Sequence, residues 1–219
     1  MRINADFAAK AVVVPKESDW VCSPESGVDR LMLDRIGGEV ARATSIVRYA
    51  PGSSFPRHKH DAGEEFLVLD GVFSDEHADY MVGTYVRNPP GSGHSPHSEN
   101  GCRILVKLRQ FDPQDLSHVV VDTSDSAVWL NAAGAAPNIL ELHEFGRERV
   151  MMIRLAEGEP LPIAADPGGV EILVVRGSID DEGIELGVES WLRFPAKQEN
   201  RLVASSDSLL WVKTGHLPS

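Results

Sequence analysis

An internal repeat is the feature of this sequence that most constrains its fold. The segment Ile46–Gly71 aligns without a gap with Met152–Gly177, at an offset of 106 positions. The same offset pairs Arg48 with Arg154, Gly52 with Gly158, Pro56 with Pro162, Glu65 with Glu171, Asp75 with Asp181, Tyr85 with Trp191, Arg87 with Arg193, Pro89 with Pro195 and Lys107 with Lys213. One register over this length indicates two copies of one structural unit. We therefore expect two domains, residues 1–115 and 116–219, linked by the polar stretch 112–117.

Each copy has the pattern of short strands separated by glycine and proline, without the periodicity of long helices. The expected strands are Glu65–Asp70, Gly83–Arg87 and Arg103–Leu108 in the first copy, and Val170–Arg176, Ser190–Phe194 and Ser208–Lys213 in the second. Strands of this length and spacing favour an antiparallel sandwich or barrel over alternating strands and helices. The predicted fold is all-β, with two jelly-roll barrels (double-stranded β-helices) in tandem.

Composition excludes several classes of function. The net charge of −12 disfavours binding to nucleic acid and to anionic membrane surfaces. No apolar run is long enough to span a bilayer, and the first residues lack a signal-peptide pattern, so a cytoplasmic protein is expected. The two cysteines, Cys22 and Cys102, are far apart and lack the spacing of a zinc knuckle or a disulfide framework.

Four residues of the first copy have the pattern of a metal site. His58 and His60 are two positions apart, so both side chains share one face of a strand, and Glu64 keeps that parity. His94 follows a turn rich in proline and glycine that can return the chain to them. Three imidazoles and a carboxylate suit zinc, ferrous iron, manganese or nickel. The four ligands would leave one or two coordination positions open to water, dioxygen or a chelating substrate.

The second copy serves as an internal control for this hypothesis. At the ligand positions it has Ala164, Asp166, Val170 and Asn200, so all four ligand types are replaced together. Loss as a set indicates one joint task, because a structural role in the barrel would have been needed in both copies.

Other titratable residues are given structural or incidental roles. Glu65, Tyr85 and Arg87 could support a metal, but they have counterparts in the second copy, which favours a structural role. His97 could replace His94 as a ligand, although an exposed loop position is the simpler interpretation. The remaining histidines show no ligand spacing and are interpreted as turn or incidental residues: His77, His118, His143 and His216.

The ligand pattern resembles the cupin family. Its first motif, with glycine, His-x-His, glutamate and a second glycine, is matched by Gly52, His58, His60, Glu64 and Gly71. Its second motif is matched by Gly83, Pro89, Gly91 and His94, with Ser98 in place of the final asparagine.

Within the cupins, residues 30–111 resemble the cupin-like domain of the ChrR anti-sigma factors. The phrases that carry the resemblance are EEFLVLD (64–70), FSDEHADY (73–80) and GTYVRNPPGSGH (83–94). The resemblance implies a zinc ion on His58, His60, Glu64 and His94. Those regulators also have an N-terminal helical domain with paired cysteines that sequesters a sigma factor. No such cysteines occur here, so sigma-factor binding is not carried over.

Three functions are weighed for this site. The first is a sensory or regulatory module of a stress response, in which a small molecule at a zinc ion changes contacts with a protein partner. The second is a non-haem iron oxygenase acting on a small diketone or hydroxyketone, with the metal in place of a separate acid and base. A sugar-phosphate isomerase ranks last, because no cluster of lysine and arginine is evident. A homodimer is a mild expectation, since small barrels often cover exposed strand edges with a second subunit.

Overall fold

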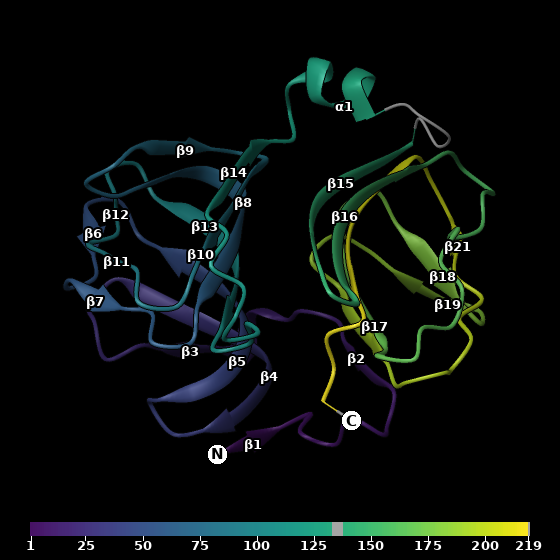
Figure 1. Cartoon of the computed structure of the whole chain (residues 1–219), viewed down its shortest axis with the longest axis horizontal. Helices are drawn as coiled ribbons and strands as arrows, with labels where there is room; N and C mark the ends of the chain where they lie inside the picture. The colour runs from purple at the N-terminus through teal and green to yellow at the C-terminus, as the bar shows by residue number, and fades with distance from the viewer. Residues whose placement is uncertain (133–137, 219) are drawn as a thin grey trace. The chain divides into compact units, whose positions relative to one another are not determined.

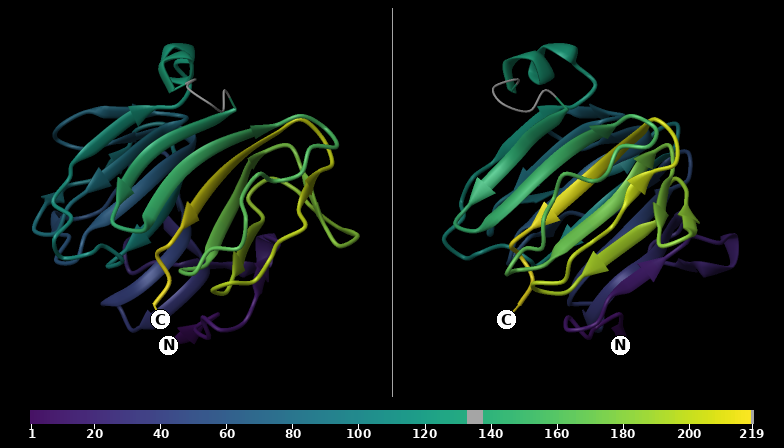
Figure 2. Two further views of the ribbon diagram at one scale, coloured as in Figure 1. Left: turned by 45° about the vertical axis from the view of Figure 1, so that its right-hand side comes forward. Right: turned by 90° about the vertical axis from the view of Figure 1, so that its right-hand side faces the viewer.

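The strands predicted from the repeat are present in a computed structural model, which describes residues 1–132 and 138–218. The chain folds into two compact units. Unit 1 comprises Met1–Ala5 and Lys16–Ser124, and unit 2 comprises Asp6–Pro15 and Asp125–Ser219. In each unit the strands curl around an apolar interior (Figures 1 and 2). The predicted all-β fold of two barrels is confirmed.

Unit 1 is built around the sheet order β1-β4-β5-β13-β8-β10-β14, with a separate pair of short strands, β7 and β11. Its elements are β1 (Arg2–Ile3), the 3-10 turn Glu17–Asp19, β3 (Trp20–Cys22), β4 (Val28–Gly37), β5 (Ala41–Tyr49), β6 (Ser53–Ser54), β7 (His58–Lys59), β8 (Glu64–Ser74), β9 (Asp79–Met81), β10 (Thr84–Asn88), β11 (Gly93–His94), β12 (His97–Ser98), β13 (Cys102–Leu108) and β14 (Val119–Asp122).

Unit 2 has a six-stranded sheet, β15-β16-β22-β17-β20-β2, and a three-stranded sheet, β19-β18-β21. Its elements are β2 (Ala11–Val13), helix α1 (Ser126–Ala132), β15 (Ile139–Phe145), β16 (Glu148–Leu155), β17 (Val170–Arg176), β18 (Ile179–Asp181), β19 (Ile184–Leu186), β20 (Trp191–Phe194), β21 (Val203–Ala204) and β22 (Ser208–Thr214). All six predicted strands are found, and β8 extends four residues beyond its predicted end.

The offset of 106 holds for backbone hydrogen bonds as well as for residue types. In unit 1 the amide groups of Gly63 and Gly91 donate to the carbonyl oxygen of His60, at 3.2 and 2.9 Å. In unit 2 the amide groups of Gly169 and Lys197 donate in the same way to Asp166, at 3.0 and 2.8 Å. The two units therefore share their turns, including the turn that carries the predicted ligands.

Each unit completes its sheet with a strand from outside the repeated core. In unit 1, β14 pairs with β10, and in unit 2, β2 pairs with the equivalent strand β20. Both strands satisfy backbone groups that an uncovered sheet edge would expose. Unit 1 therefore extends past the predicted boundary at residue 115 to Ser124, and ten residues near the N-terminus belong to unit 2.

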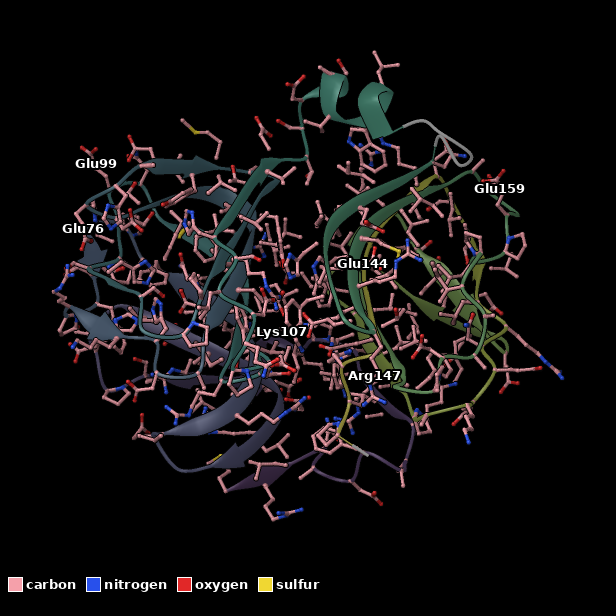
Figure 3. All side chains as sticks on the ribbon, viewed as in Figure 1. Glu76, Glu99, Lys107, Glu144, Arg147 and Glu159 are labelled. Atoms are coloured by element: carbon pink, nitrogen blue, oxygen red, sulfur yellow. The ribbon has the colours of Figure 1, made fainter. Side chains whose placement is uncertain are left out.

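Each central sheet has a row of buried charged side chains on its outward face, which is the face that points away from the barrel interior. Glu65 stands opposite Arg87 on one side and Lys107 on the other, and none of the three is more than 1% exposed (Lys107 is labelled in Figure 3). Arg87 Nη1 lies 3.1 Å from Glu65 Oε2, and the Tyr85 hydroxyl donates to the same oxygen at 2.6 Å. Since alternate strand residues face opposite ways, Glu65 points away from the interior that Glu64 faces.

Candidate metal centre

The four predicted ligands meet at one end of the unit 1 barrel. His58 on β7 stands directly opposite His94 on β11, because the two short strands are paired in antiparallel register. His60 follows β7, and Glu64 is the first residue of β8. Between them Gly63 adopts a φ of 79°, where a Cβ atom would come within 2.3 Å of the Phe111 ring. Glycine is therefore needed at this bend between His60 and Glu64.

The geometry of the four side chains fits a single ion. One ligand atom from each residue lies within 4.8 Å of the others. His60 Nε2 and His94 Nε2 lie 3.5 and 3.4 Å from Glu64 Oε1. Metal bonds of roughly 2.1 Å place ligand atoms about 3 to 4 Å apart, so little contraction is needed. His60, Glu64 and His94 are at most 5% exposed, whereas His58 is half-buried.

A hydrogen bond to Nδ1 orients each of the three imidazoles. His58 Nδ1 contacts the Pro56 carbonyl oxygen at 3.0 Å, His60 Nδ1 contacts Ser92 Oγ at 3.1 Å, and His94 Nδ1 contacts Asp75 Oδ2 at 3.0 Å. The Ser92 hydroxyl donates to the Pro89 carbonyl, so its oxygen can accept from His60. With the protons on Nδ1, all three Nε2 lone pairs are available to a cation.

Two electrostatic features also fit a bound cation. His60 Nε2 is buried and forms no hydrogen bond to any described residue, which is costly for a polar atom unless it binds something else. Burial lowers the pKa of His60, an effect that the charge of Glu64 only partly offsets, and this favours the neutral form that ligates metals.

Asp75 gives His94 a different electrostatic environment. Burial alone would lower the pKa of His94, but the hydrogen bond to Asp75 and the charge of Glu64 raise it above its ordinary value. Burial alone would raise the pKa of the Asp75 carboxyl, but hydrogen bonds from His94 and from the His77 and Ala78 amide groups lower it. Asp75 is therefore an ionised carboxylate that holds the His94 ring in place. The repeat aligns Asp75 with Asp181, but nothing in the sequence indicates that Asp75 orients His94.

A cavity of about 360 Å³ opens onto the four ligands from the barrel interior. Its walls are largely apolar, with Val47, Tyr49, Phe73, Ile104 and Val106 among the lining residues. Four cationic side chains also line it: Arg30, Arg35, Lys59 and Arg109. No such cluster is evident in the sequence, because these residues are dispersed along the chain and only the folded barrel gathers them around one cavity.

The other histidines lie outside the cluster. His97 is exposed on β12 and is not one of the grouped ligands. His77 and His118 line a separate cavity of about 330 Å³, which Asp75 and His94 also border. In unit 2, His216 Nε2 lies 2.7 Å from the fully buried Glu171, so it has a structural contact that its sequence position did not indicate.

The fold is shared with solved structures of low sequence identity. One is the bacterial pirin YhhW from Escherichia coli in complex with nickel(II), with a TM-score of 0.68 and 14% identity, covering 94% of this chain and 100% of the other. Another is a salicylate 1,2-dioxygenase from Pseudaminobacter salicylatoxidans, with a TM-score of 0.60 and 13% identity, covering 78% and 70%. A third is a cupin 2 conserved barrel domain protein from Leptotrichia buccalis, with a TM-score of 0.56 and 11% identity, covering 89% and 91%.

The chain thus has the fold of cupin proteins, with two barrels. Residues 8–112 match the family model of the ChrR cupin-like domain, the family that the sequence motifs resemble. No curated protein matches the sequence. Among the described residues, no helix has the length and apolar character needed to cross a membrane.

Proposed function

We propose that unit 1 binds one divalent metal ion through His58, His60, Glu64 and His94 and responds to a small molecule that reaches this ion, as a sensory module of the ChrR type. The convergence of three imidazole nitrogens and a carboxylate oxygen beside a cavity is the observation that carries the proposal. The bound ion would supply a Lewis-acid centre with one or two open positions.

Zinc is the proposed ion, with iron, manganese and nickel as alternatives. Imidazole and carboxylate ligands suit all four metals, and the ChrR resemblance favours zinc. In this proposal Asp75, Ser92 and the Pro56 carbonyl orient the imidazoles. The apolar wall of the cavity limits the access of water to the small molecule. A protein partner would then read the change in the barrel. Partner and homodimer both remain predictions.

Metal analysis of two histidine variants tests the proposal. Plasma mass spectrometry of the purified protein should find about one metal ion per chain, mainly zinc. His58→Ala should lose that ion, whereas His97→Ala, which changes an exposed neighbouring histidine, should keep it. Unit 2 should stay folded in both variants, which circular dichroism and proteolysis would check. Full metal occupancy in His58→Ala would refute the ligand set.

A second candidate function is a non-haem iron oxygenase acting on a small diketone or hydroxyketone. The apolar cavity beside the open side of the ligand cluster favours it, and a salicylate dioxygenase shares the fold. The two candidates differ in the metal and in oxygen consumption. Iron as the dominant ion, together with oxygen uptake on adding such a ketone, would replace the sensory proposal with this one.

A further inference from the structure

Two arginines face the unit 1 cavity from β4, across the barrel sheet from the metal ligands. Arg30 and Arg35 both line the cavity. Arg35 stands opposite Ala43 on β5, Ala43 stands opposite Leu108 on β13, and Leu108 stands opposite Glu64 on β8. Arg35 and the ligand Glu64 thus occupy one row, three strand spacings apart, which is roughly 14 Å along the curved sheet.

A β-bulge gives Arg35 its inward direction. The pairing of β4 with β5 shifts between Met32 and Asp34. In an uninterrupted strand Arg35 would share the outward parity of Leu31, but one extra residue reverses that parity. The bulge therefore turns a guanidinium toward the interior, where an arginine is costly unless it has a partner.

Arg35 lacks a carboxylate partner among the described residues. It is 5% exposed, and its hydrogen bonds go to the backbone carbonyl oxygens of Gly38 and Glu39. Burial and the nearby charge of Arg30 lower its pKa, an effect that the charge of Glu39 only partly offsets, and a bound anion would further favour the charged guanidinium. Arg30 pairs with Glu39 at 3.4 Å, but the Glu39 side chain is 72% exposed, and such a pair contributes little free energy.

The charge of the cavity lining also favours an anionic ligand. Four cationic side chains face three carboxylates, Glu39, Asp61 and Glu64, a formal surplus of one positive charge, to which the proposed divalent ion would add two. The whole chain has a net charge of −12, so this cavity is an exception to the field around it. The rest of the lining is largely apolar and includes Leu108, which stands in the row between Arg35 and Glu64.

We infer that the ligand of this cavity is a small organic acid, with one oxygen at the metal, an apolar body against the β5 and β13 walls, and a carboxylate on Arg35 assisted by Arg30. A planar guanidinium can bind a carboxylate through two parallel hydrogen bonds. The inference deepens the proposed function, because the other end of the ligand rests on the proposed metal centre.

Straight-chain dicarboxylates from malonate to adipate are suitable probes, because the series varies the separation between a carboxylate for the ion and a carboxylate for Arg35. Calorimetric titration of the metal-loaded protein should give an optimum at one chain length. Monomethyl esters of the same acids should bind more weakly. Alkyl phosphates of matched length test whether the oxyanion is a phosphate; tighter binding of the phosphate would overturn the assignment of a carboxylate.

Arg35→Gln should weaken binding of the best dicarboxylate by at least about 30-fold, since it removes a buried charged partner. Arg103→Gln is the matched control. Arg103 lies on the face of β13 that points away from the cavity, so this variant should bind the dicarboxylate like wild type. Arg35→Lys keeps the charge but not the two-point geometry and should fall between them. Equal affinity in Arg35→Gln and wild type, with both proteins folded, would overturn the inference.

The same titration on chelator-treated protein separates this inference from the proposed function. If the metal proposal fails and the purified wild type contains no metal, an effect of Arg35→Gln on dicarboxylate affinity would still support the anion site. If metal is bound at about one ion per chain but the acid and its ester bind equally well, the metal centre stands and the anion site is refuted. Melting temperature and metal content of each variant show whether it has folded.

Discussion

The two units share one backbone frame but differ in what fills the barrel. In unit 1 the strands β7 and β11 bring His58 and His94 together beside a cavity. At the equivalent positions of unit 2, Val170 is fully buried in an apolar cluster, and the Asn200 amide donates to the Ile163 carbonyl at 2.8 Å. Leu161 and Leu202 belong to the same cluster. A packed interior has thus replaced the ligand set in unit 2.

The charged row on the outward face is retained in both units. Glu171 stands opposite Arg193 and Lys213, as Glu65 stands opposite Arg87 and Lys107. Trp191 Nε1 donates to Glu171 Oε1 at 2.8 Å, where the Tyr85 hydroxyl donates to Glu65. The two units thus use different side chains to donate a hydrogen bond to the equivalent glutamate. The comparison shows that the frame and the site vary independently, because they use opposite faces of the same strands.

Exchanging one residue between the units should give the largest effect. Val170→Glu puts an unpaired carboxylate into a packed apolar core and should destabilise unit 2 by about 4 kcal/mol or more. The reciprocal change, Glu64→Val, should abolish metal binding but leave the metal-free unit 1 as stable as before. Urea unfolding with domain-resolved probes measures both. A stable, metal-binding Val170→Glu variant would show that unit 2 is a latent site.

Gly63 and its counterpart Gly169 should tolerate replacement by alanine equally poorly. A Cβ atom at Gly63 or Gly169 would come within 2.3 Å of Phe111 or Leu217, at a positive φ. Replacement by alanine should cost about 3 kcal/mol, the sum of a left-handed alanine and an overpacked contact. Gly52 and Gly158 also have positive φ but open space around them. Their alanine variants, as matched controls in urea unfolding, should lose only about 1 kcal/mol.

Asp75 and its counterpart Asp181 should separate a role at the metal from a role in stability. Asp75 orients His94, so Asp75→Asn should weaken metal binding about 10- to 100-fold, measured by competition with a chromophoric chelator. Asp181 instead pairs with Lys10 at 2.7 Å, within unit 2. Asp181→Asn should leave metal affinity unchanged. Equal metal affinity in Asp75→Asn and wild type would remove Asp75 from the centre.

Loss of the Tyr85 hydroxyl, which donates to the buried Glu65, should give the smallest effect. Tyr85→Phe removes the hydroxyl that Glu65 accepts and should destabilise unit 1 by about 1 to 3 kcal/mol. Trp191→Phe removes the equivalent donor from unit 2 and also leaves a cavity, so its cost should be larger. Metal content should be the same in both variants and in wild type. A change in metal content in Tyr85→Phe would connect the charged row to the site.

Local pattern was sufficient to predict the strands and the clustering of His58, His60, Glu64 and His94. Residue alternation places His58 and His60 on one face, and the repeat places both copies in one register; both properties depend on residues close in sequence or on a constant offset. The exchange of β2 and β14 at the sheet edges could not be predicted this way. The backbone groups at those edges pair with segments outside the repeated core. The short apolar runs of β2 and β14 do not specify which strand they pair with.

The sequence by itself determined that the chain forms two related β-barrels and that only the first has the residues for a metal ion. The tertiary structure decided which other side chains surround this cluster of candidate ligands. Asp75 reaches His94 from the loop after β8, and the bulge in β4 turns Arg35 inward. Parity along a strand is a local property, but a bulge that reverses it is defined by pairing with a neighbouring strand, and a cavity by the whole barrel.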